Sequence, residues 1–424
     1  MKLVCAPKLH PFTGVEDELD VILYDHTDTL ARGSVGASVK DRILREKLQP
    51  ATKAWDFLSL ALSVTVADMA GHRNASPDGW TRQLELVVAV VDPNFWNTQS
   101  RLIEKMLGFL TTDTWRVHFI GGGEAPALSY TPVWLSEDCV LLLSGGLDSF
   151  TGAIDLVANG KHPLAVRQIV RGDAENQRSL SQAIGSLRHL QFNHNAQAPN
   201  PENPPSQRAR SLIFIAFGVL AATTLQRYQA GNDVTLYMCE NGFISINPPL
   251  TGARLGSLST RTTHPIFLNL IRQLLDTAGL RVHVENPYQL KTKGEMLREC
   301  VTQVVLQAHA VKTTSCGRYK RFGYTHCGRC VPCLVRRAAF LVWGITDTTK
   351  YVYEDLGYDD AAHAAFDDVR AVAMALAEVQ SDGLESWIGT ALSSALIGDI
   401  GQLRMMVGRG LEELGSLFKV YGVK

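Results

Sequence analysis

The sequence has almost no net charge, since 41 Lys and Arg are balanced by 42 Asp and Glu in 424 residues. This balance gives no bulk electrostatic reason to expect binding to DNA, RNA or a membrane surface. The chain also lacks a run of about 18 apolar residues, which argues against a transmembrane helix. Residues 1–12 lack the apolar core and cleavage site of a signal peptide, so we expect a cytoplasmic protein.

Internal repeats and low-complexity runs are absent as well, and 46% of the residues are hydrophobic. A chain of this length and composition can bury two or three cores. Changes in pattern divide it into residues 1–136, 137–346 and 347–424. The first segment is interpreted as a small accessory α+β domain with a linker of Gly and Pro near 121–132. The last segment is acidic and helical in pattern, and its simplest interpretation is a solvated packing element.

The central segment alternates short apolar stretches with amphipathic ones. This alternation predicts an α/β domain with a five-stranded parallel sheet, covered by helices on both faces. Strands are expected at 139–143, 164–170, 190–194, 234–238 and 280–285. Helices are expected at 149–158, 174–188, 207–229, 265–278 and 294–309.

The most informative motif follows the first of these strands and precedes a helix. It consists of Ser144, Gly145, Gly146, Leu147, Asp148 and Ser149. Glycines let a backbone turn sharply and approach a phosphate closely. Backbone N–H groups and the start of the next helix then hold the anion, with two serine hydroxyls as further donors. The Walker A pattern is missing, so this is a different kind of phosphate loop.

A second motif contains four of the eight cysteines. Its members are Cys316, Cys327, Cys330 and Cys333. Four thiolates at these spacings predict a closed structural zinc site, and an iron–sulfur cluster is the alternative. His326 is not expected to be a ligand, because four thiolates complete the coordination. Such a site needs reduced thiols, which agrees with a reducing compartment.

These two motifs resemble those of a known family. The loop resembles that of the PP-loop ATP pyrophosphatases, which split ATP into AMP and pyrophosphate. The resemblance implies a sheet of the adenine-nucleotide α-hydrolase type, with ATP and Mg²⁺ at the carboxyl ends of its strands. Together with the cysteine segment, residues 315–337, the chain resembles the QueC family of 7-cyano-7-deazaguanine synthases. Those enzymes convert 7-carboxy-7-deazaguanine to a nitrile with ATP and ammonia, and the resemblance spans residues 138–345, about half the chain.

The resemblance also implies roles for residues outside the two motifs. Asp148 would place Mg²⁺ or orient the loop, and Lys293 would neutralise the α-phosphate, with Lys291 as the alternative. Phosphate contacts are expected from Arg178 and from either Arg208 or Arg210. Glu240 would bind the deazaguanine base, and Asn241, Arg261 and His264 are expected to be further substrate-binding residues. Asn241 departs from the family, which has an acidic residue there, so the identity of the substrate is in question.

The extra segments at both ends make this chain similar to the longer QueC-like proteins of bacterial anti-phage operons, the QatC branch of the Qat system. That resemblance implies an ATP-dependent C–N ligase that joins a deazaguanine carboxylate to an amine, on a partner protein from the same operon or on ammonia. A nitrile synthase for queuosine or DNA modification is the alternative. A tRNA-modifying PP-loop enzyme and an inactive nucleotide sensor are further ones. The oligomeric state stays open, a homodimer included.

Overall fold

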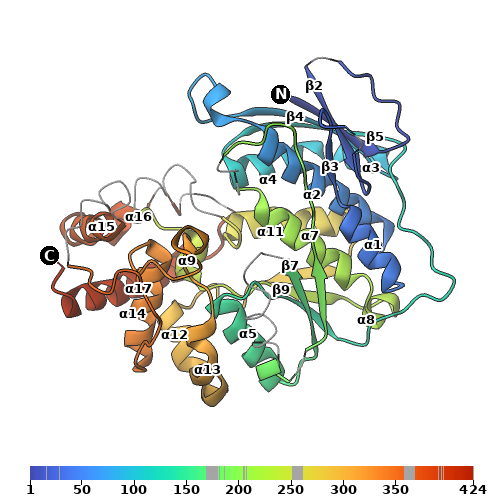
Figure 1. Ribbon diagram of the computed structural model, residues 1–424. Coiled ribbons are helices and arrows are strands. Elements are labelled where there is room, and N and C mark those ends of the chain that lie inside the picture. Colours follow the sequence, from blue (N-terminus) through green and yellow to red (C-terminus); the bar gives the residue numbers. More distant parts are fainter. Residues whose placement is uncertain are drawn as a thin grey trace.

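A computed structural model of the chain describes two five-stranded sheets with helices between and around them (Figure 1). The described residues are 1–423 without 16, 28, 169–179, 181, 186, 204–205, 207, 251–260, 358–367, 390, 393 and 395. No helix in these ranges is long and apolar enough to cross a membrane.

The first sheet lies in the N-terminal segment and has the strand order β3-β2-β1-β4-β5. Its strands are β1 (Lys2–Pro7), β2 (Glu18–Leu23), β3 (Gly33–Val35), β4 (Gln83–Ala89) and β5 (Thr114–Ile120). All four strand pairs are parallel, so the expected α+β domain is an α/β unit. Parallel neighbours need crossover connections. The connection from β3 to β4 contains α1 (Ala37–Arg45) and α2 (Thr52–Ala70). The connection from β4 to β5 contains α3 (Pro93–Thr98) and α4 (Ser100–Thr111).

The second sheet is the predicted one, and it has the strand order β10-β9-β6-β7-β8 with all pairs parallel. Its strands are β6 (Cys139–Leu142), β7 (Pro163–Gln168), β8 (His189–Phe192), β9 (Val234–Tyr237) and β10 (Val282–Glu285). The five expected strands are therefore confirmed. They differ by a few residues at their ends, because the apolar stretches run on past the ladder hydrogen bonds.

The helices of this unit also follow the expected order, with two corrections. They are α5 (Leu147–Ala158), α7 (Arg210–Ala222), α8 (Gln226–Gln229), α9 (Gly242–Ile246), α11 (Pro265–Thr277), α12 (Lys293–Glu299) and α13 (Gln303–His309). The helix expected at 207–229 is interrupted before α8, where Leu225 has an extended backbone. The helix expected at 294–309 is interrupted at Cys300, whose ψ of 131° is not helical. The helix expected at 174–188 falls largely outside the described residues.

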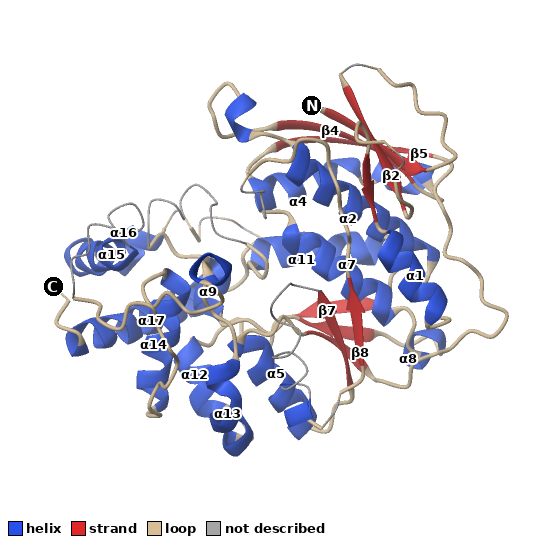
Figure 2. Ribbon diagram, in the orientation of Figure 1, coloured by secondary structure: helices blue, strands red, loops and turns tan. Residues whose placement is uncertain are grey.

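The two sheets enclose a double layer of helices (Figure 2). Helix α2 from the first unit packs against α7 from the second. Sixteen of the 19 residues of α2 and 11 of the 13 residues of α7 are buried. A helix that is buried on every side is typical of the interior of a large protein. One continuous cluster of buried apolar side chains accordingly runs from the first sheet to the second.

Hydrogen bonds around a buried ion-pair cluster of the N-terminal unit connect the two units at the edge of this core. The buried Arg82 guanidinium is 2.6 Å from carboxylate oxygens of both Asp68 and Asp113. Asp68 also accepts a hydrogen bond of 3.1 Å from the backbone N–H of Ala209, just before α7. Arg208 donates to the Thr111 carbonyl at 3.0 Å, and its guanidinium lies 4.3 Å from the Trp80 ring. The N-terminal unit is thus joined to the start of α7 by polar contacts as well as by the core.

The C-terminal segment packs against the second unit. It contains α15 (Asp368–Asp382), α16 (Leu384–Ile388) and α17 (Ile400–Val420), and it follows α14 (Val331–Trp343). Helix α17 contacts α9 and α14 and buries apolar residues in the main core. At Gly410 a Cβ atom would collide with the Phe243 ring, so α17 can approach α9 this closely only with glycine there. Helix α17 is an integral part of the described core.

Candidate functional site

The phosphate-loop motif forms a tight turn between β6 and α5. Gly145 has φ +84°, a left-handed conformation that favours glycine. The Gly146 N–H donates to Ser144 Oγ at 3.3 Å, and Ser149 Oγ donates to the Gly146 carbonyl at 3.0 Å. The two serine Oγ atoms lie 3.1 Å apart. Leu147 starts α5, so both hydroxyls lie at a helix N-terminus, where an anion is stabilised.

Asp148 lies beneath this turn and is bound on both carboxylate oxygens. Lys293 Nζ donates to Oδ1, and Asn241 donates to Oδ2 from its backbone N–H at 3.2 Å and its side-chain Nδ2 at 2.7 Å. Lys293 and Asp148 are both buried. Of the two roles expected for Asp148, this geometry favours orienting the loop. Lys293 neutralises Asp148 in the structure, and it does not line the cavity described next.

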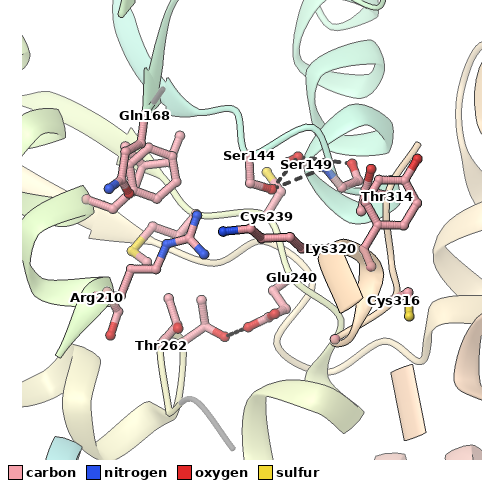
Figure 3. Close-up of a pocket in the computed structure, with 18 of the residues that line it drawn as sticks. Ser144, Ser149, Gln168, Arg210, Cys239, Glu240, Thr262, Thr314, Cys316 and Lys320 are labelled. Atoms are coloured by element: carbon pink, nitrogen blue, oxygen red, sulfur yellow. Dashed lines mark hydrogen bonds between the residues drawn. The ribbon is translucent and has the colours of Figure 1, made fainter. Parts of the chain in front are cut away.

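A cavity of about 480 Å³ opens above the loop at the carboxyl ends of β6, β7 and β9. Figure 3 shows Arg210 and Lys320 pointing toward one another across it, with Ser144 and Ser149 on a third side. Arg210 is the first residue of α7. Two cations and a helix N-terminus facing one space favour a polyanionic ligand such as a nucleotide phosphate chain.

The floor of the cavity carries Glu240, which follows β9. Its carboxylate accepts a hydrogen bond from Thr263 Oγ1, which lies 2.6 Å from Ser245 Oγ. The Glu240 backbone is fixed by Asn286, whose side chain bonds its N–H at 3.3 Å and its carbonyl at 2.8 Å. A carboxylate held in this way can accept the adjacent N–H donors of a guanine-like ring edge.

Asn241, Arg261 and His264 do not line this cavity. Asn241 caps α9 by accepting from the Ile244 N–H, in addition to its bonds to Asp148. Arg261 donates to the Phe109 carbonyl of α4 at 2.8 Å. His264 caps α11, and burial lowers its pKa to about 3. In the structure these three side chains serve in packing and helix capping, and the substrate contacts expected from them stay predictions.

Replacing Arg261 with alanine should loosen the segment that carries Thr262 and Thr263. The Phe109 carbonyl loses its donor, which we expect to cost about 1–3 kcal/mol of stability. Because Thr263 holds Glu240, the KM for the 7-carboxy-7-deazaguanine that the family resemblance implies should rise several-fold, while the KM for ATP should change little. Arg101, an exposed residue of α4, supplies the matched control variant Arg101→Ala. Equal KM values for wild type and Arg261→Ala would contradict this prediction.

The arginines expected near the phosphates have different positions. Arg210 lines the cavity, whereas Arg208 is used between the two units. Arg178 lies outside the described residues. Of the two arginines that the sequence left open, Arg210 is the one that lines the cavity, so its phosphate contact stays a prediction.

The four clustered cysteines form a metal-binding geometry. Their Sγ atoms all lie within 4.8 Å of one another, with Cys327 to Cys333 and Cys330 to Cys316 both at 3.9 Å. Four thiolates around a zinc ion with Zn–S bonds of about 2.3 Å would have similar separations. Backbone N–H groups donate to Cys316 Sγ and Cys327 Sγ, which stabilises thiolate charge. The donor set therefore fits zinc. His326 instead accepts from the Ser315 N–H at 3.1 Å.

The cysteine segment also forms one wall of the cavity, which the sequence did not reveal. Lining residues from it are Thr314, Cys316, Gly317, Tyr319, Lys320 and Tyr324. The Thr314 N–H donates to the Gly145 carbonyl at 3.0 Å, so this segment is attached to the phosphate loop. Behind it, the fully buried Arg336 donates to Thr313 and Ser315. In the sequence, Lys320 is distinguished only by its position between two predicted metal ligands. That position does not predict the direction of its side chain.

Comparison with known proteins agrees with the motifs. No protein-family model matches the chain. A 7-cyano-7-deazaguanine synthase of Cupriavidus pinatubonensis is 26% identical over 240 residues, covering 51% of this chain and 99% of the relative. The protein of that name from Ralstonia pickettii is 25% identical over 241 residues, with 51% and 100% covered. The one from Methanocaldococcus jannaschii is 32% identical over 89 residues, with 20% and 38% covered. About half of this chain thus lies outside the matches to the bacterial proteins.

Proposed function

We propose that this chain is an ATP-dependent ligase that activates the carboxylate of a 7-carboxy-7-deazaguanine-like molecule and joins it to an amine. The proposal rests chiefly on one observation. A single cavity joins the serine hydroxyls of the phosphate loop to the Glu240 carboxylate, with Arg210 and Lys320 between them. The similarity to proteins named 7-cyano-7-deazaguanine synthase supports the same substrate class.

The reaction needs activation because a carboxylate is a poor acyl donor. A substrate carboxylate oxygen attacks the α-phosphorus of ATP, which forms an acyl-adenylate and breaks the bond to pyrophosphate. Ser144, Ser149 and the start of α5 would hold the departing pyrophosphate, and Arg210 and Lys320 would neutralise its charge. An amine then attacks the acyl carbon, AMP leaves, and the amine gives up one proton. Mg²⁺ would accompany the ATP phosphates.

Zinc would be held by the four cysteines as a closed structural site. With four thiolate ligands it has no open position, so the chemistry that it supplies is local folding. The residues around it bind and orient: Thr314 fixes the loop, and Lys320 faces the cavity. Reduced thiols in this cluster agree with a cytoplasmic location.

The finer proposal is that the enzyme acts in antiviral defence with a partner protein as the amine. It is supported by the half of the chain that lies outside the matches to the bacterial synthases. To test this proposal, the protein is mixed with 7-carboxy-7-deazaguanine, ATP, Mg²⁺ and ammonia, with and without the product of the neighbouring gene. The products are then identified by mass spectrometry. A deazaguanine mass on the partner supports it, whereas free nitrile favours the biosynthetic alternative. AMP formation in neither mixture would refute the ligase assignment.

Glu240 supplies a direct test of substrate recognition. The variant Glu240→Gln replaces one acceptor oxygen with an amide donor, which would face a donor on the ring edge. A charged hydrogen bond contributes about 1.5–3 kcal/mol. We therefore expect kcat/KM for the carboxylate substrate to fall about 10- to 100-fold, since 1.4 kcal/mol is a factor of ten. The Kd for ATP should not change. Glu378→Gln, on the exposed face of α15, is the control.

A further inference from the structure

The C-terminal helix brings a buried carboxylate to the start of α12. Glu413 lies on α17 and is 8% exposed. One of its oxygens accepts a hydrogen bond from Thr292 Oγ1, and the other accepts from the Gly294 N–H at 3.3 Å. These two donors flank Lys293, the residue that neutralises Asp148 beneath the phosphate loop.

The same turn is held by a second set of contacts. Thr292 caps α12 by accepting from the Glu295 N–H at 3.1 Å, and Glu295 returns a bond to the Thr292 N–H at 2.8 Å. Arg409, one turn before Glu413 on α17, lies 2.6 Å from the Glu295 carboxylate. Two residues of α17, Arg409 and Glu413, therefore hold the first turn of α12.

The space between these helices is closed. A Cβ atom on Gly294 would lie 2.5 Å from the Glu413 carboxylate and 2.8 Å from Val342 of α14. The first turn of α12 is thus enclosed by α14 and α17 and cannot shift toward either. Helix α17 also lies outside residues 137–346, which carry the motifs of the proposed catalytic unit.

We propose that Glu413 is a positioning residue for Lys293, through which the C-terminal segment controls the phosphate loop. This inference rests on the proposed function. Glu413 fixes the Thr292 hydroxyl and the Gly294 N–H, which sets the direction in which the Lys293 side chain leaves α12. Lys293 in turn keeps Asp148 neutralised, so the loop can accept an anion. A movement of α17 would be transmitted along this chain of contacts.

The charge state of Glu413 gives an independent measurement. Burial raises its pKa to about 7, against the opposing hydrogen bonds from Thr292 and Gly294. The charged groups around it are Lys293, Glu295 and Arg298 on α12 and Arg409 on α17, while α14 presents Val342. The pKa of the Glu413 carboxyl is higher in the folded state than in the unfolded state. Its contribution to stability is therefore fully present below the unfolded-state pKa, and it is lost as the pH rises through about 7. The Tm of the wild type should therefore fall relative to that of Glu413→Gln between pH 5.5 and pH 8.

Pyrophosphate binding, measured by calorimetry on the full chain, tests the proposal. Glu413→Leu keeps the apolar packing but removes both acceptors, and it should weaken pyrophosphate binding about tenfold at a temperature well below its Tm. Glu413→Gln should bind almost as the wild type does, because the Thr292 hydroxyl can rotate to accept from the amide. Glu412→Leu changes the exposed neighbour and is the control. Glu413→Ala replaces the leucine variant if that variant does not fold.

A double variant distinguishes this role from a merely structural one. In a Lys293→Met background, Glu413→Leu should weaken pyrophosphate binding no further, because Lys293 carries its effect. A loss of the same size in both backgrounds would overturn the proposal, as would unchanged binding by Glu413→Leu. Wild-type protein that does not bind pyrophosphate at all would instead refute the proposed function, and this inference with it.

Discussion

Lys293→Met is expected to weaken the binding of ATP and pyrophosphate by about a hundredfold or more. The ammonium group forms a buried ion pair with Asp148, directly under the phosphate loop. Removing one partner of a buried pair leaves the other charge uncompensated, which costs about 3–5 kcal/mol. Here the orphaned charge is also negative and lies beneath the site that should receive an anion, so repulsion adds to the loss.

Calorimetry with pyrophosphate and with ATP checks this expectation. Lys312→Met changes an exposed lysine and should leave binding unchanged. The double variant Asp148→Asn with Lys293→Met removes both charges, and it should recover at least about tenfold of the lost affinity. Unchanged pyrophosphate binding by Lys293→Met would show that the ion pair has no part in forming the site.

Cys327→Ser should abolish both metal binding and activity. A structural zinc site contributes about 10–16 kcal/mol to the folding of small zinc-binding domains, because the metal organises a segment with little core of its own. In this chain that segment supplies Lys320 and Thr314 to the cavity. Loss of the metal should therefore remove one wall of the site and release the contact between Thr314 and the loop.

Elemental analysis should find one zinc per wild-type chain and less than a tenth of that in Cys327→Ser. Limited proteolysis should show new cleavage within residues 310–357 of the variant. Cys300→Ser changes a buried thiol outside the cluster, so it should lower stability yet keep zinc. Iron and acid-labile sulfide in the wild type would instead establish the iron–sulfur alternative.

The sequence predicted the parts of the fold that have a strong local pattern. Apolar stretches followed by turn residues identified all five strands of the second sheet, and the glycines and serines after β6 identified the phosphate loop. In the first sheet, β1 and β2 were not predicted, because a loop rather than a helix connects them and the alternation of strand and helix is missing there. The pairing of these strands depends on contacts between residues far apart in the sequence. A hydrophobic pattern within one segment does not indicate such contacts.

The candidate site was predictable only in part for the same reason. The phosphate loop and the four cysteines can be recognised from their spacing in the sequence. The position of an arginine side chain, in contrast, depends on which residues pack beside it in the fold. Arg261 is paired with Phe109 across 152 positions, and Lys293 with Asp148 across 145. Neither partner can be inferred until the N-terminal unit and α12 have been placed. Lys320 was missed because metal ligands around a residue do not say which way it faces.

The burial of α2 on every side restricts how this protein can have been assembled and how it can change. Helix α2 packs against α7, and nearly all residues of both helices are buried, so separating the two units would expose apolar surface on each. An N-terminal unit moved to another protein would therefore need a helix that matches α7. A substitution that enlarges one helix must be matched by one that reduces the other, and the two halves are constrained to diverge together.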